Sequence, residues 1–82
     1  MTKVAVVFAE GFEEIEALSP VDVFRRAGFD CSMIGLESTS VTGSHGIQVA
    51  MDGVFDGNFA DYDLVVLPGG MPAQLIYATT KP

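Results

Sequence analysis

The sequence predicts an α/β fold in which a doubly wound parallel sheet is built from alternating strands and helices. Residues 3–9 and 63–67 form two apolar runs rich in valine, which is typical of strands buried on both faces of a sheet. Each run is followed by a segment with helical features, and a short β excursion lies between them. This β-α-β order, followed by a further βα unit, is the pattern of a doubly wound sheet.

The first helix is expected to begin near Phe12 or Glu13 and to end at Ala27. Acidic residues in its first turn suit the positive end of the helix dipole, and Gly28 suits a left-handed C-cap. Pro20 interrupts the apolar pattern, but a serine followed by a proline is itself a helix start signal. We therefore expect one kinked helix or two abutting helices.

Turn-forming residues divide the rest of the chain into short elements. The elements expected there are a strand at residues 29–36, an edge strand or hairpin arm at 47–51, a loop around a short helical turn at 52–62, a strand at 63–67 and a helix that opens within 71–79.

Length and composition limit the classes of protein that the chain can belong to. A chain of 82 residues buries only about 60–65% of its unfolded surface, yet 49% of its residues are hydrophobic. One helix is too little to cover both faces of such a sheet, so we expect residues 1–82 to be the N-terminal half of a single domain.

The net charge of -7, with no basic stripe, argues against nucleic acid and anionic membranes as partners. One cysteine and no signal peptide or membrane span indicate a cytoplasmic location.

Two motifs are expected to meet at one rim of the sheet, because ligands bind outside the carboxyl ends of parallel strands. Glu13, Glu14 and Glu16 follow the first strand, and Gly69 and Gly70 follow the strand at 63–67. A glutamate that is desolvated at this rim keeps its proton and can act as a general acid. Two glycines in a turn leave backbone N–H groups free to bind a substrate oxygen. Two of the three acids are also explained by the helix dipole alone.

Other residues and other α/β families offer weaker hypotheses. Cys31 is expected to be a small buried hydrophobe at the opposite end of the sheet, since Asp30 beside it disfavours a thiolate. His45 lies in a loop without a cluster of further ligands, so we expect no metal site. Neither a dinucleotide-binding motif nor a P-loop follows the first strand.

Three motifs occur in an order that resembles the ThiJ/PfpI superfamily, and in particular the branch of the Parkinson-linked deglycase. They are Ala9-Glu10-Gly11-Phe12-Glu13-Glu14-Ile15-Glu16, then Pro20-Val21-Asp22-Val23-Phe24-Arg25-Arg26-Ala27-Gly28, then Val65-Val66-Leu67-Pro68-Gly69-Gly70. The resemblance covers essentially the whole chain. It implies a flavodoxin-like domain of roughly twice this length that forms a homodimer.

The resemblance also assigns roles to individual residues. Glu16 matches the glutamate that moves protons beside the family's reactive cysteine, and that cysteine has no counterpart in these 82 residues. Gly69 and Gly70 match the turn whose N–H groups face the substrate oxygen. Glu13, Arg26 and His45 match positions near the dimer interface. In the intact protein, Glu16 is therefore expected to be the one acid of its cluster that faces the pocket and to be at least partly buried, whereas Glu13 and Glu14 are expected to be exposed or paired between subunits.

The implied activity is that of a glyoxalase or protein deglycase that acts on small aldehydes such as methylglyoxal and needs no cofactor. The alternatives are a redox-sensing or chaperone-like protein without turnover, and a relative of the family's intracellular peptidases and amidotransferases. Because the cysteine is missing, the 82-residue polypeptide alone is expected to be inactive.

Overall fold

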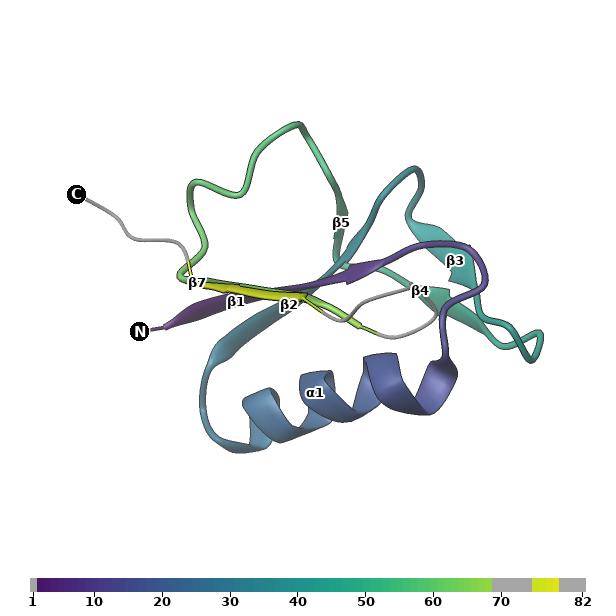
Figure 1. Cartoon of the computed structure of the whole chain (residues 1–82), viewed down its shortest axis with the longest axis horizontal. Coiled ribbons are helices and arrows are strands. Elements are labelled where there is room, and N and C mark those ends of the chain that lie inside the picture. Colours follow the sequence, from purple (N-terminus) through teal and green to yellow (C-terminus); the bar gives the residue numbers. More distant parts are fainter. Residues whose placement is uncertain (1, 69–74, 79–82) are drawn as a thin grey trace.

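The computed structural model describes residues 2–68 and 75–78, and these residues form two sheets and one helix (Figure 1). The larger sheet has five strands in the order β5-β2-β1-β6-β7, and the smaller sheet pairs β3 with β4. The elements in chain order are β1 (Lys3–Phe8), α1 (Glu14–Arg26), β2 (Asp30–Gly35), β3 (Ser40–Thr42), β4 (Gln48–Ala50), β5 (Gly53–Val54), β6 (Leu64–Leu67) and β7 (Leu75–Ala78).

The position of β1 between β2 and β6 confirms the predicted α/β class. β1 pairs in parallel with β2 from Lys3↔Asp30 to Phe8↔Gly35, and in parallel with β6 through Val4↔Leu64. The chain thus first moves to one side of β1 and then crosses to the other side. Such a reversal of strand order marks the place where ligands bind in doubly wound sheets.

Helix α1 begins and ends where the sequence signals predicted. Gly28 has a φ of +88°, a conformation that glycine adopts without a steric penalty. The Ala27 N–H donates to the Val23 carbonyl at 3.0 Å and completes the last turn. Acidic residues in the first turn and basic residues in the last both complement the helix dipole. Pro20 lies inside one helix that continues from Glu14 to Arg26.

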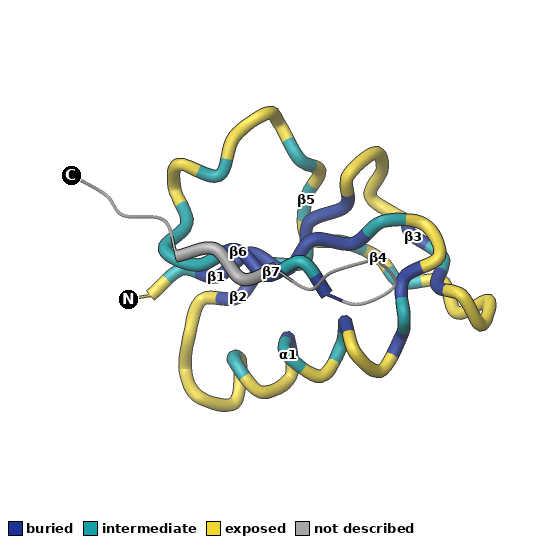
Figure 2. The backbone as a smooth tube through the Cα atoms, in the orientation of Figure 1, coloured by how far each residue is buried: buried dark blue, intermediate teal, exposed yellow. Residues whose placement is uncertain are grey.

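The apolar side chains of the sheet form two separate cores, and Figure 2 shows that buried residues are concentrated in the central strands. On one face, α1 packs against β1 through a cluster that contains Phe8, Phe12 and Val21. On the other face, a smaller cluster around Val7 and Val65 is covered by aromatic residues of the segment between β5 and β6. The two clusters explain why β1 is apolar at nearly every position.

Two expectations about the second half of the chain were wrong. Residues 52–62 contain strand β5, whose neighbour Phe55 donates its N–H to the Gly35 carbonyl at 2.8 Å, because the free edge of β2 offers backbone partners. A helix was expected within 71–79, but Leu75–Ala78 form strand β7, antiparallel to β6. Isoleucine and tyrosine favour strands, and the edge of β6 supplies the hydrogen bonds. Residues 71–74 and 79 lie outside the described residues.

The predicted hairpin arm near residues 47–51 is confirmed as β4, which pairs antiparallel with β3. Within residues 2–68 and 75–78, no helix is both long enough and apolar enough to cross a membrane.

Candidate functional site

The predicted rim lies where β1 and β6 end side by side. The connection from residue 9 to residue 13 leaves β1 there and leads into the first turn of α1. Pro68, which follows β6, is buried. Gly69 and Gly70 lie outside the described residues, so their predicted role at this rim stays a prediction.

Glu16 is exposed in the described residues because of the phase of the helix. Its burial in the intact protein stays a prediction. The buried residues of α1 are Glu14, Ala17 and Val21, which share one face at spacings of three and four residues. Glu16 lies two positions from Glu14, about 200° around a helix with 3.6 residues per turn.

Glu14 is the buried acid of the cluster, with a relative exposure of 6%. The expectation that it would be exposed or paired between subunits was therefore wrong. Its Oε2 accepts the His45 backbone N–H at 2.7 Å, and its Oε1 lies 2.9 Å from His45 Nδ1. Burial raises the pKa of the Glu14 carboxyl, but hydrogen bonds from the His45 side chain and from backbone N–H groups outweigh it and lower the pKa to about 2. Glu14 is thus a carboxylate at neutral pH.

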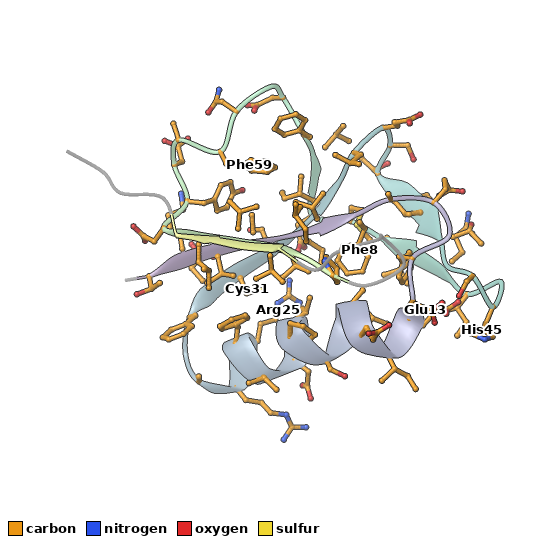
Figure 3. All side chains as sticks on the ribbon, in the orientation of Figure 1. Phe8, Glu13, Arg25, Cys31, His45 and Phe59 are labelled. Carbon is orange, nitrogen blue, oxygen red and sulfur yellow. The ribbon has the colours of Figure 1, made fainter. Side chains whose placement is uncertain are left out.

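His45 and Ser44 bring the turn between β3 and β4 onto the start of α1, and Figure 3 shows Glu13 and His45 side by side there. The Ser44 hydroxyl lies 3.2 Å from Glu13 Oε1 and 3.1 Å from His45 Nδ1. The hydrogen bond to Glu14, together with the charges of Glu14 and Glu13, raises the pKa of the exposed imidazole of His45. We call the contacts of Glu14 with residues 43–45 the clasp.

The clasp also contains a set of possible metal ligands. One ligand atom from each of Glu13, Glu14 and His45 lies within 4.8 Å of the others. Both oxygens of Glu14 also lie within hydrogen-bond distance of nitrogen atoms of His45, so the carboxylate has partners from the chain itself.

The motifs predicted positions near a dimer interface for Glu13 and His45, which stays a prediction, and they did not predict the contact between Glu14 and His45. A signal was present in the sequence, because Glu14 precedes Ala17 and Val21 at the spacing of a buried helical face. Its partner His45 lies 31 residues away, and no local pattern joins the two.

The remaining predicted residues lie away from the rim. Arg26 is exposed and pairs with Asp22 at 3.0 Å along the helix. Cys31 is buried at the start of β2, as predicted, and burial raises the pKa of its thiol. The carbonyl of Cys31 accepts hydrogen bonds from Arg25, whose guanidinium also pairs with Asp52 at 2.8 Å. This contact fixes the end of α1 that is remote from the site.

A cavity of about 200 Å³ lies beside the carboxyl end of β1, on the side of β2 rather than of β6. Glu10, Glu37 and Ser38 are among the residues that line it. Glu10 also accepts the Thr42 N–H at 2.8 Å, so it ties the connection after β1 to the small sheet.

The chain is similar to proteins of one family throughout its length. The family model described as DJ-1/PfpI matches residues 2–81. "Putative cysteine protease YraA" of Bacillus subtilis (strain 168) is 38% identical over an alignment of 82 residues, and the match covers 98% of this chain and 48% of that protein. The chain spans about half the length of the curated relatives that it matches.

Solved structures with the same fold include two DJ-1 proteins. Oxidized DJ-1 of Toxoplasma gondii is 36% identical with a TM-score of 0.78, and the match covers 88% of this chain and 40% of that one. DJ-1beta of Drosophila melanogaster is also 36% identical with a TM-score of 0.78, with coverage of 85% and 39%. The flavodoxin-like arrangement implied by the sequence motifs is therefore present, and the chain belongs to the DJ-1/PfpI family.

Proposed function

We propose that this chain forms the N-terminal half of a DJ-1/PfpI domain that converts small reactive aldehydes without a cofactor. The proposal is supported by the place of the first turn of α1, which begins beside the carboxyl ends of β1 and β6 at the reversal of strand order. In this fold class that rim is where small molecules bind. The acidic segment at residues 13–16 and the glycine turn at 69–70 belong to the two connections that leave it.

In the proposed reaction, a cysteine from outside these 82 residues attacks the aldehyde carbon of methylglyoxal. A C–S bond forms, and the carbonyl oxygen takes up a proton to give a hemithioacetal. Glu16 then moves a proton from this carbon to the neighbouring one, while the hydroxyl proton passes to the oxygen of the neighbouring carbon, which leaves a thioester of lactate. Water cleaves the thioester, releasing lactate and regenerating the thiol. The N–H groups of Gly69 and Gly70 stabilise the negative charge that develops on oxygen.

The proposal requires that Glu16 becomes enclosed when the domain is complete. Its position on the outer side of the first turn leaves it accessible to groups that pack against α1 from outside. A glutamate enclosed beside a thiol is suited to general acid–base catalysis.

The decisive experiment replaces Glu16 by Gln in the complete domain and measures turnover of methylglyoxal. We expect a fall of about 10²–10⁴ in kcat, the range for loss of a general acid–base. Asp30→Asn, a change at an exposed acid at the start of β2 and therefore at the opposite end of the sheet, serves as the control and should leave kcat unchanged. Wild-type turnover in the Glu16→Gln variant would refute the assignment.

A redox-sensing role is the second candidate, and the oxidized state of the Toxoplasma gondii DJ-1 structure favours it. A sensor would lose one reduced thiol on treatment with dilute peroxide but would show no turnover of any aldehyde. Intact mass and a lactate assay on the same preparation separate the two. The name of the Bacillus subtilis relative suggests peptidase activity, which a peptide-cleavage assay would test.

We further propose that the complete protein is a homodimer. Ile15 on the outer face of α1 is 81% exposed and Val23 is 60% exposed, so α1 offers two large apolar side chains to a second subunit. Glu13 is half-buried and His45 is exposed at the start of α1, and Arg26 is exposed at its opposite end. The single free Cys31 agrees with a reducing compartment, and we propose the cytoplasm.

A further inference from the structure

Hydrogen bonds from the end of β3 and from the turn that follows it hold the connection between β1 and α1 in place. The Gly11 N–H donates to the Thr42 carbonyl at 2.8 Å, and the Ser44 N–H donates to the Phe12 carbonyl at 2.8 Å. Glu10 accepts the Thr42 N–H, also at 2.8 Å. Three hydrogen bonds thus fix the path of the chain just before the first helical turn.

The clasp continues this anchoring into the helix itself. Glu14, the first residue of α1, receives two hydrogen bonds from His45, one from the backbone and one from the imidazole. The absence of a side chain at Gly43 makes room for this placement of Glu14, because a Cβ there would overlap Glu14 Oε2 and would lie 2.8 Å from its Cγ. The direction in which the first turn starts is therefore set by the β3–β4 turn.

Glu16 lies in that same first turn. A helical turn is rigid, so a rotation or shift of Glu14 moves the backbone of Glu16 with it. We propose that Glu14 and His45 are positioning residues that aim Glu16 at the reacting atoms and make its placement depend on pH. This inference rests on the proposed function of Glu16.

The pH dependence follows from the groups that face His45. From α1 these are Glu14 and Glu13, and from its own loop the neighbour is the uncharged Ser44. Both acids favour the imidazolium form, so the pKa of His45 is raised above 6.5. The contribution of His45 to the clasp is complete below that value and is lost as the pH rises through the raised pKa. For Glu14, the contribution is present above pH 4.5 and is lost as the pH falls toward about 2.

Asn provides a matched substitution for His45, since its side-chain amide nitrogen occupies nearly the place of Nδ1 and donates without titrating. In the complete domain, His45→Asn should retain kcat near pH 6 and should lose the fall in kcat that the wild type shows at alkaline pH. His45→Ala should lower kcat about 10–100-fold near pH 6 with little change in KM, because misplacement by about 1 Å costs up to about 100-fold. The difference from the wild type should shrink as the pH rises through the raised pKa of His45. Wild-type kcat and an unchanged pH profile in His45→Ala would overturn the inference.

A second measurement tests the positioning of Glu16 independently of the proposed enzymatic activity. The ¹³C chemical shift of the Glu16 carboxyl, assigned by its absence in Glu16→Gln, should change in His45→Ala but not in His45→Asn. If the wild type has no aldehyde turnover, the proposed function fails, and the chemical shift still decides whether the clasp positions Glu16. An unchanged Glu16 signal in His45→Ala would show that it does not.

Discussion

Gly43→Ala tests the clasp through its packing. A methyl group at this position would overlap Glu14 Oε2 and would lie 2.8 Å from Cγ, whereas carbon atoms pack best at about 3.5–4.0 Å. Glu14 would have to move by roughly 1 Å. Its two hydrogen bonds, at 2.7 and 2.9 Å, would then exceed normal hydrogen-bond lengths. The φ of Gly43 is not positive, so alanine introduces no backbone strain there.

The expected cost is that of an overpacked site, about 1–3 kcal/mol in the free energy of unfolding. For a domain of 150–250 residues, 1 kcal/mol shifts Tm by about 2–4 °C. Gly43→Ala should therefore lower the Tm of the complete domain by roughly 2–12 °C, measured by calorimetry or circular dichroism. Gly53→Ala is the control, because its Cβ would meet only Ile34 Cδ1, at 3.7 Å. It should be neutral or slightly stabilising, since alanine restricts the unfolded chain.

A double-mutant cycle separates the clash from any other effect of the methyl group. In a Glu14→Ala background, the atoms that the new Cβ would overlap are gone, so adding Gly43→Ala should cost little more. The coupling between the two changes should then equal most of the cost of Gly43→Ala alone. A Gly43→Ala protein as stable as the wild type, or costs that simply add, would refute this account of the clasp.

Two further predictions concern the core and the proposed subunit interface of the complete domain. Phe8 is fully buried and makes an edge-to-face contact with Phe12 at 4.9 Å, so Phe8→Ala should lower the free energy of unfolding by about 3–5 kcal/mol in a denaturant titration. Val54→Ala, at a position that is 41% exposed, should stay within about 0.5 kcal/mol of the wild type, and an equal loss in both would contradict the placement of the core. Ile15→Glu, in contrast, should turn a dimer into a monomer in light scattering without a large loss of helix content. A dimer of unchanged stability in that variant would exclude the outer face of α1 from the interface.

The order of the central elements could be predicted because their signals are local. The valine-rich runs, the glycine at the end of α1 and the acidic first turn each depend on neighbouring residues in the sequence. β5 and β7 could not be predicted in the same way, since each is stabilised by hydrogen bonds to the edge of a strand that is distant in sequence. Leu75–Ala78 is apolar enough to suit a helix or a strand, and the open edge of β6 decides between them.

The different surroundings of the three glutamates could not be predicted from neighbouring residues alone. Glu13, Glu14 and Glu16 are the same residue type within one turn, so only the phase of the helix distinguishes them. That phase follows from the apolar face that contains Ala17 and Val21, which turns Glu14 inward. A buried carboxylate needs hydrogen-bond donors, and His45 provides two of them from 31 residues away. These hydrogen bonds hold Glu14 in one place, so Glu14 is suited to fix the position of the first turn of α1 at the rim. Glu16, in contrast, is exposed, so its surroundings change when the rest of the domain packs against α1. The proposed role of Glu16 in catalysis requires such a change.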